Sequence, residues 1–212
     1  MYSIQSQEYD VIIMGAGFAG VCQARHLLLN IPNIKVALID SRPEERTDKD
    51  LKIGESTVEV SAMFLYRELG LYEYLIENQV PKQGLNFHWP KDQIKTDSIS
   101  DYYSLWSLLN PPMPSFQIER AKLERDLLKM NKDLGAVFYK GQVVDVNLTP
   151  TDAVNSVIVK LESGQIELKA KHLIDATGRR GGAGACRHRR RCPPGITDNQ
   201  SPRTARQWAD RS

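Results

Sequence analysis

Two groups of residues near the start of the chain have the types and spacing that suit nucleotide binding. Gly15, Gly17 and Gly20 form a G-x-G-x-x-G turn directly after the apolar run Val11–Met14. Such glycines make a tight turn, let backbone approach a pyrophosphate and let a helix pack closely on a strand. The helix that follows offers free N–H groups and the positive end of its dipole to phosphate.

Asp40 completes this pattern at the end of a second apolar run, "IKVALID". An acidic residue about 20 residues after the glycines accepts hydrogen bonds from ribose hydroxyls. Strand, turn, helix, strand and acid together predict a dinucleotide site, although the motif does not separate FAD from NAD. An α/β unit whose glycine turn binds no phosphate is the alternative.

Lys82 is the second candidate for chemistry, because it precedes Phe87, His88 and Trp89 in "VPKQGLNFHWP". One interpretation is a solvated loop lysine. The other is a catalytic amine in a channel, since an amine that is partly desolvated loses its proton more easily and becomes a nucleophile. These residues alone leave both interpretations open.

The elements that must position these residues follow from hydrophobic periodicity. Ser56 and Glu59 have the spacing of a capping box, which predicts a helix with Ser56 as N-cap. Its predicted apolar face is formed by Val60, Phe64 and Leu65, with Met63 beside them. A further helix is predicted in "FQIERAKLERDLL", with Ile118, Leu123, Leu127 and Leu128 on its apolar face. Arg120 in that segment is either a solvated helix charge or a binding residue.

The C-terminal part of the body reads as strands. "GAVFYKGQVVDVNL" contains two short strand-like runs, and "NSVIVKLESGQIELKA" predicts a hairpin with its turn at Ser163 and Gly164. "KHLIDATG" predicts a buried strand that returns to a glycine, Gly178. The order of elements predicts a three-layer α/β, Rossmann-like FAD-binding fold with a β-meander and part of a substrate layer, here truncated.

Charge divides the chain near Arg179. Residues 1–178 carry 24 acidic and 19 basic side chains, whereas residues 179–212 carry 9 arginines, no lysine and 2 aspartates. The tail has almost no apolar periodicity, so it cannot bury enough surface to fold alone. A disordered nucleic-acid-binding arm is one interpretation, and Cys186, His188 and Cys192 fit no standard zinc spacing. A shifted reading frame or truncated gene explains the abrupt change in composition better.

The N-terminus and the apolar runs indicate the compartment. "MYSIQSQEYD" lacks the basic region of a signal peptide, and no apolar run reaches the roughly 18 residues of a membrane helix. Three cysteines make no disulfide framework. We therefore expect a cytoplasmic protein that binds neither membrane nor nucleic acid and holds no metal.

The motifs and their order resemble the FAD-dependent halogenases, within the superfamily of FAD-dependent aromatic hydroxylases. The resemblance rests on GAGFAG, Asp40, "GEST" at residues 54–57, Gln117-x-x-Arg120 and "DATG", and covers residues 8 to about 179. It implies that residues 54–57 line the isoalloxazine, that Arg120 lies near the cofactor, that residues 143–144 lie near adenine, and that Asp175 and Gly178 lie near the pyrophosphate or ribose. The implied cofactor-binding residues are Gly15, Ala16, Gly17, Phe18, Ala19, Gly20, Asp40, Ser41, Gly54, Glu55, Ser56, Thr57, Gln117, Arg120, Val143, Val144, Asp175 and Gly178.

Lys82, Phe87 and Trp89 match the lysine and aromatic residues that halogenases carry after the GEST helix. The resemblance implies that Lys82 is catalytic and holds hypohalous acid, made from halide, oxygen and reduced FAD, beside an aromatic substrate that is free or bound to a carrier protein. A separate flavin reductase would supply the reduced FAD. Another FAD enzyme, such as an aromatic hydroxylase or a prenyl reductase, is the alternative.

The chain departs from this family after DATG. Both the Trp-x-Trp-x-Ile-Pro signature and the Gly-Asp-Ala segment of the family are absent, so a fragment that is inactive, or a truncated product without function, is also expected. The implied organisation is a first FAD-binding part (1–78), a substrate-layer insertion (79–115), a second FAD-binding part (116–179) and a disordered or out-of-frame tail (180–212).

Overall fold

A computed structural model describes residues 6–45, 55–83, 85–91, 97–106, 114–149 and 154–178. Gly54 and the tail at 180–212 lie outside these ranges. The expectations for both therefore remain predictions.

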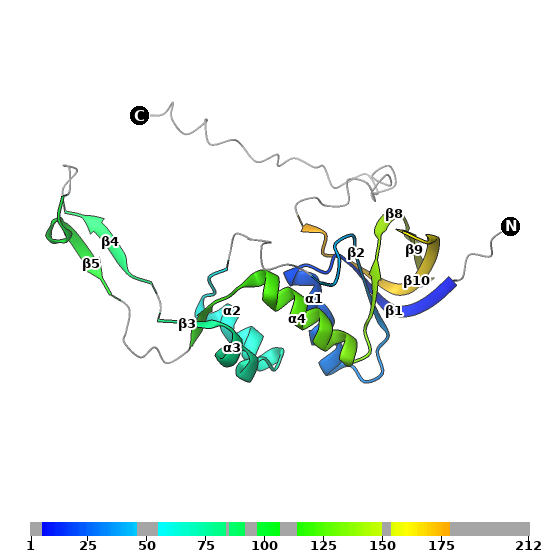
Figure 1. The fold of residues 1–212 in the computed structure, drawn as a ribbon, viewed down its shortest axis with the longest axis horizontal. Helices are drawn as coiled ribbons and strands as arrows, with labels where there is room; N and C mark the ends of the chain where they lie inside the picture. The colour runs from blue at the N-terminus through cyan, green and yellow to red at the C-terminus, as the bar shows by residue number, and fades with distance from the viewer. Residues whose placement is uncertain are drawn as a thin grey trace, which may run out of the picture.

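A six-stranded mixed sheet in the order β7-β2-β1-β10-β9-β8 is the main sheet of the molecule (Figure 1). β1 (Ser6–Met14) lies between β2 (Val36–Asp40) and β10 (Gly164–Asp175) and is parallel to both. β7 (Val137–Lys140) continues the parallel part beside β2. β8 (Gln142–Asn147) and β9 (Asn155–Leu161) add antiparallel strands beyond β10.

Each face of this sheet has its own core, because successive side chains of β1 point to opposite faces. Val11 and Ile13 join a cluster with the helices, whereas Ile12 and Met14 join a cluster with the β8–β9 meander. α1 (Phe18–Asn30) and α4 (Arg120–Asp133) cover the helical face. Helices, sheet and meander make the three layers that the sequence predicts, so the predicted fold class is confirmed.

The segment after Glu55 differs from the sequence-based prediction. Ser56 does not cap a helix, because it forms a β-bridge with Gln117. α2 (Glu59–Met63) begins later and continues into a π-helical turn, Phe64–Glu68, before α3 (Tyr72–Asn78). The predicted apolar face is wrong in part, since Val60 and Phe64 are exposed, whereas Leu65 is buried as predicted and Ala62 is buried as well.

Short strands connect this helical unit to the rest of the molecule. β3 (Val80–Lys82) pairs with β6 (Ser115–Gln117), which leads into α4. Because α4 begins at Arg120, Ile118 lies before the helix rather than on its face, although it is buried as predicted. The turn of the β9–β10 hairpin is at residues 162–163, one position earlier than predicted.

A separate hairpin of β4 (Phe87–Pro90) and β5 (Tyr102–Leu105), with a 3₁₀ turn at Ile99–Asp101, lies away from the main sheet (Figure 1). Phe87 stacks on Trp89, and His88 meets the edge of Trp106. All four of these side chains are exposed. The aromatic residues of this region are therefore not core residues among the described parts of the chain.

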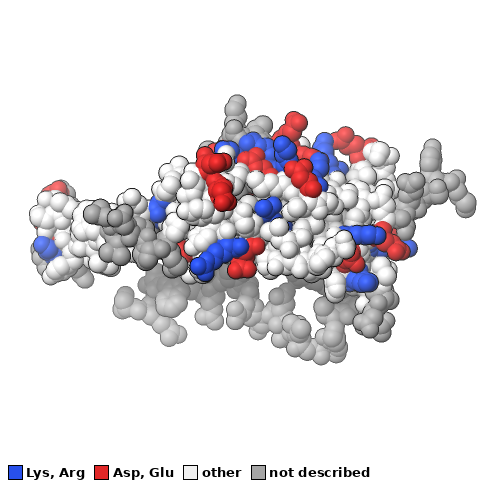
Figure 2. Space-filling model, turned by 90° about the horizontal axis from the view of Figure 1, so that it is seen from below, with Lys and Arg blue, Asp and Glu red and all other residues white. Residues whose placement is uncertain are grey.

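The described surface carries charges of both signs. Figure 2 shows acidic and basic side chains intermixed on the face seen from below Figure 1. Lys132 pairs with Glu44 and Arg125 with Asp126. In the ranges that the structure describes, no helix is long and apolar enough to cross a membrane.

Candidate dinucleotide site at the carboxyl edge of the sheet

The glycine turn lies at the carboxyl edge of the sheet, held between strands on both sides. The Gly15 N–H donates to the Ile39 carbonyl at 2.7 Å, and Gly15 has φ +105°, which favours glycine. A Cβ at Gly15 would lie 2.4 Å from the Ala176 carbonyl oxygen, and a Cβ at Gly20 would lie 1.9 Å from the Gly15 carbonyl oxygen. At both positions, backbone atoms occupy the space that a side chain would need.

Gly17 is different, because among the described residues a Cβ there would meet only the Arg42 Nη2 atom, at 3.4 Å. No backbone from the described ranges closes this side of the turn within 4 Å. Gly17 is also the N-cap of α1, so the N–H groups of Phe18, Ala19 and Gly20 belong to the first turn of that helix. Gly17 is the position where a missing side chain lets a pyrophosphate approach. It is also the position of the three that faces a side chain, Arg42, rather than backbone.

Asp40 faces the glycine turn from the adjacent strand. Its Oδ2 accepts a hydrogen bond from the Ala16 N–H at 2.8 Å, and its Oδ1 accepts one from the Arg42 N–H at 2.9 Å. Burial raises the pKa of the Asp40 carboxyl, but hydrogen bonds from Arg42 and Ala16 outweigh this effect and hold the pKa below its ordinary value. An ionised carboxylate therefore stands beside the turn.

The DATG segment supports the same turn from the third strand. The Ala176 N–H donates to the Met14 carbonyl at 2.8 Å, and Gly178 has φ +73°. The Asp175 carboxylate accepts from the Thr177 N–H and Oγ, at 3.0 and 2.5 Å. Asp175 and Gly178 therefore lie at the sheet edge that carries Gly15 and Asp40.

Arg120 joins three of the predicted cofactor segments. Its guanidinium lies over the Phe18 ring, 5.4 Å from the centroid, and its backbone N–H donates to the Glu55 carboxylate at 3.2 Å. The same guanidinium pairs with Glu124 at 2.8 Å. Arg120 is thus a half-buried residue that contacts the glycine turn, the GEST loop and α4, which favours a binding residue over a solvated helix charge.

The GEST loop is fixed to β6 by backbone and side-chain bonds. Thr57 Oγ1 donates to the Phe116 carbonyl and accepts from the Phe116 N–H, both at 2.7 Å. The Ile118 N–H donates to the Glu55 carbonyl at 2.6 Å. Gln117 bridges to Ser56, so the two predicted flavin-lining segments lie side by side.

Lys82 contacts this loop directly. Its Nζ donates to Ser56 Oγ at 2.8 Å and to the Thr57 carbonyl at 2.6 Å. Its own carbonyl accepts from Ser115 Oγ at 3.0 Å. The half-buried ammonium thus lies against the loop rather than at a loop tip, but Trp89 belongs to the separate β4–β5 hairpin and does not share this position (Figure 1).

The structure places the three remaining described cofactor-binding predictions in different environments. Val143 packs on the core cluster that contains Met14 and Ile39, and Val144 lies at a bulge of β8. Ser41 follows Asp40 and is exposed.

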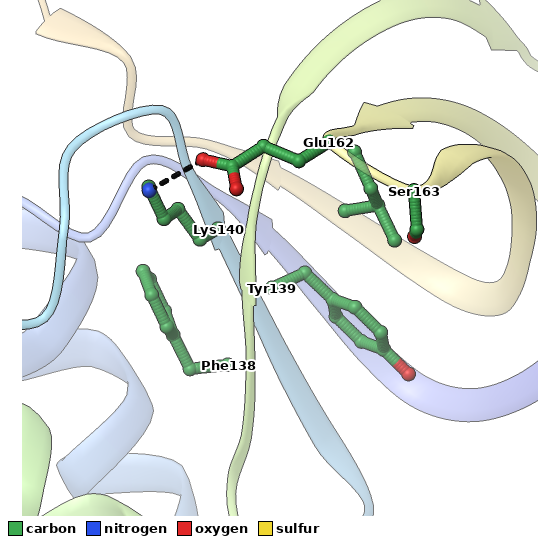
Figure 3. Close-up of a pocket in the computed structure, with 6 residues that line it drawn as sticks. Phe138, Tyr139, Lys140, Glu162 and Ser163 are labelled. Atoms are coloured by element: carbon green, nitrogen blue, oxygen red, sulfur yellow. Dashed lines mark hydrogen bonds and ion pairs between the residues drawn. The ribbon is translucent and has the colours of Figure 1, made fainter.

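A shallow hollow of about 360 Å³ opens beside β7 (Figure 3). Lys140 pairs with Glu162 there at 2.6 Å, and none of the predicted cofactor residues lines the hollow.

Arg42 and Glu124 belong to this site but were not among the predicted residues. Arg42 Nη2 pairs with Asp40 Oδ2 at 2.7 Å, and Arg42 Nη1 lies 3.7 Å from the fully buried Glu124 carboxylate. The sequence contains one pattern from which the role of Glu124 could have been predicted. Glu124 lies four residues after Arg120, among the apolar positions of α4, which is the spacing of a helical ion pair. No local pattern links Arg42 to Glu124, because their pairing depends on how the chain just after β2 approaches α4 in the folded protein.

Cys22 lies in the core beneath the helices, where its pKa is raised, in contrast to the lowered pKa of Asp40. Burial, with a further contribution from Glu124, raises the pKa of its thiol to about 12. A thiol with so high a pKa is not a nucleophile at neutral pH. The place of Cys22 in the helical core fits a structural role.

The structure brings together the glycine turn, the N-terminus of α1 and the Asp40 carboxylate at the end of β2. This combination defines a dinucleotide-binding α/β protein. The family model described as "FAD binding domain" matches residues 8–194. The chain therefore belongs to the FAD-binding domain family, whose cofactor is FAD. The match extends beyond Arg179 into the predicted tail.

Two curated relatives carry the comparison further. The chain is 47% identical over 189 residues to a flavin-dependent halogenase of Dictyostelium discoideum, covering 81% of this chain and 31% of that protein. It is 29% identical over 192 residues to a 1H-pyrrole-2-carbonyl-[peptidyl-carrier protein] chlorinase of Pseudomonas fluorescens, covering 83% of this chain and 40% of that protein. The chain thus spans less than half the length of these relatives.

Solved structures share the fold. The myxobacterial chondrochloren halogenase superposes with a TM-score of 0.66 at 22% identity, covering 83% of this chain and 38% of that one. A geranylgeranyl bacteriochlorophyll reductase-like protein of Thermoplasma acidophilum superposes with a TM-score of 0.59 at 19% identity, covering 81% and 40%. Halogenases and a reductase-like protein therefore have this fold in common.

Proposed function

We propose that this chain is the FAD-binding portion of a flavin-dependent halogenase, with Lys82 as its catalytic amine. The observation that carries the proposal is the Lys82 ammonium bonded to Ser56 and Thr57, the loop predicted to line the flavin ring. The 47% identity to a flavin-dependent halogenase supports the same choice.

The residues present fit FAD. The turn at Gly17 is open to a pyrophosphate, the first turn of α1 offers N–H groups, and Asp40 offers carboxylate oxygens to ribose hydroxyls. Glu55, Ser56, Thr57, Gln117 and Arg120 form one connected wall for the ring. When bound in its reduced form, FAD supplies the reducing equivalents with which oxygen converts halide to hypohalous acid.

Lys82 would then hold and transfer the halogen. In its neutral form, the amine attacks the halogen of hypohalous acid, an N–halogen bond forms, and water leaves. The aromatic substrate next attacks that halogen, and the ring proton is lost while the amine is restored. The loop contacts of Lys82 orient the amine for both steps, which need no further oxidant.

The partners follow from this chemistry. A flavin reductase supplies reduced FAD, a halide ion supplies the halogen, and an electron-rich aromatic substrate, free or carried on a protein, accepts it. The carrier-bound alternative gains weight from the similarity to a chlorinase whose substrate is a pyrrole carried on a peptidyl-carrier protein.

A chimera tests the proposal, with residues 8–178 of this chain replacing the matching part of the Dictyostelium relative. Lys82→Ala should abolish halogenation but leave oxygen consumption by reduced flavin unchanged, because oxygen reduction needs only the flavin site. Lys82→Arg should also fail, since a guanidinium stays protonated and cannot attack as an amine. Product formation and oxygen uptake are measured in the same reaction.

Lys91→Ala is the matched control, because Lys91 belongs to the same 79–115 insertion as Lys82 but donates to the Ser100 carbonyl on the separate hairpin. It should halogenate at the wild-type rate. Halogenation by Lys82→Ala at near wild-type rate would overturn the proposed role and return the hydroxylase and reductase alternatives to equal standing.

A further inference from the structure

The Asp40 carboxylate already uses its hydrogen-bonding capacity. An ionised carboxylate has about four acceptor positions on its two oxygens. Oδ1 accepts from Arg42 N and Arg42 Nε, at 2.9 and 3.1 Å. Oδ2 accepts from Ala16 N and Arg42 Nη2, at 2.8 and 2.7 Å. Ribose hydroxyls can reach Asp40 only after some of these bonds are given up.

The Arg42 side chain is the donor that can withdraw. Ala16 is held by the glycine turn, whereas the Arg42 side chain is 37% exposed and flexible. Its Nη2 atom lies 3.4 Å from the place where a Cβ of Gly17 would stand. The guanidinium thus lies on the open side of the turn, where a pyrophosphate must approach.

We propose that Arg42 binds the pyrophosphate of the dinucleotide and, in doing so, releases the Asp40 carboxylate to the ribose. The inference rests on the proposed function only in taking FAD as the ligand. A guanidinium binds phosphate oxygens in the same two-pronged way as carboxylate oxygens, so the exchange replaces one charged partner with another.

Glu124 makes the exchange possible without a large movement. Its buried carboxylate lies 3.7 Å from Arg42 Nη1 and also pairs with Arg120. Arg42 can therefore leave Asp40 while its charge stays close to a carboxylate. The positive charge of Arg42 thus stays beside the turn with and without the dinucleotide. Only its main partner changes, from the Asp40 carboxylate to the pyrophosphate.

The experiment compares ligands that differ in phosphate. Binding of FAD, ADP and adenosine to the wild-type chain and to Arg42→Gln is measured by calorimetry. Arg42→Gln should weaken FAD and ADP by at least about tenfold, because charge-assisted hydrogen bonds to phosphate are lost. Adenosine should bind as well as before or more tightly, because Asp40 is freed without any loss of phosphate contact.

Lys140→Gln is the matched control. Lys140 is the strand neighbour of Asp40 and is also a cation, but its ammonium pairs with Glu162. It should leave all three affinities unchanged. Arg42→Lys, which keeps the charge but not the two-pronged geometry, should give intermediate affinity for ADP and provides the measurement if Arg42→Gln folds poorly.

The outcomes separate this inference from the proposed function. Tighter binding of both ADP and adenosine to Arg42→Gln would show that Arg42 only blocks Asp40, and unchanged binding would show that it has no role. Either result overturns the inference and leaves FAD binding intact. A folded wild-type chain that binds neither FAD nor ADP would overturn both.

Discussion

Asp40 has two functions in this fold, because it ties the glycine turn to β2 and offers a charge to a ligand. Its lowered pKa means that the folded state favours the ionised carboxylate. The resulting stability is present above the ordinary value of 3.8. It is lost as the pH falls through the lower pKa of the folded protein.

Asp40→Asn should therefore lower the free energy of unfolding at pH 7 by about 1–2 kcal/mol. This figure allows for the partial exposure of Arg42. The difference between wild type and variant should shrink below pH 3.8, as the wild-type carboxyl also takes up a proton. Urea unfolding at pH 7 and pH 3 measures both differences. A difference of equal size at both pH values would contradict the electrostatic account.

Arg42 and Asp40 also show what residue patterns can and cannot predict about the site. Asp40 follows from spacing alone, since the distance from the last glycine places it at the end of the adjacent strand. Arg42 and Glu124 do not, because they meet only when the chain just after β2 approaches α4 in the folded protein. Lys82 is an intermediate case, since its order after the GEST segment fits its contact with Ser56 and Thr57 but gives no sign of its separation from Trp89.

At the scale of elements, the three glycines of one turn have different physical reasons to be glycine. Gly20 lies against backbone, so Gly20→Ala forces the turn and α1 apart and should cost about 3 kcal/mol of stability. Gly17 has φ −75°, and within the described part of the chain a Cβ there would meet only the end of the Arg42 side chain. Gly17→Ala should cost about 1 kcal/mol or less, mainly through its N-cap position.

FAD affinity should respond differently from stability. Gly17→Ala should lower FAD affinity by about tenfold or more in a folded protein, because its methyl group takes the space that a pyrophosphate needs. Thermal unfolding and flavin fluorescence titration measure the two effects separately. A Gly17→Ala protein with wild-type FAD affinity would remove this turn from the binding site.

The GEST segment shows why element boundaries could not be predicted from local signals. Ser56 and Glu59 have the spacing of a capping box, yet Ser56 bonds across the chain to β6 and Lys82 instead. Ile118 has helical periodicity, yet its N–H donates to Glu55 and the helix starts after it. In both cases a tertiary hydrogen bond outweighs a local preference, whereas the glycine turn needed no distant partner to be recognised.

At the scale of the whole molecule, the body and the tail are expected to be independent. Removing residues 180–212 should leave FAD affinity unchanged, because the glycine turn, Asp40 and residues 55–57 are held in place by hydrogen bonds among residues 6–178. Titration of the shortened and full-length chains with FAD tests this expectation. Since the family match reaches residue 194, weaker binding after truncation would identify the tail as part of the binding domain.

The pairing of β1 with β10 fixes the order in which the sheet can form during translation. Ser6 pairs with Glu167 and Met14 with Asp175, so one edge of β1 finds its partner only when nearly all of residues 6–175 have been made. Synthesis proceeds from the N-terminus, and β2 is available much earlier. Until β10 emerges from the ribosome, the nascent chain presents an apolar strand with an open edge, the kind of surface that chaperones cover and aggregates extend.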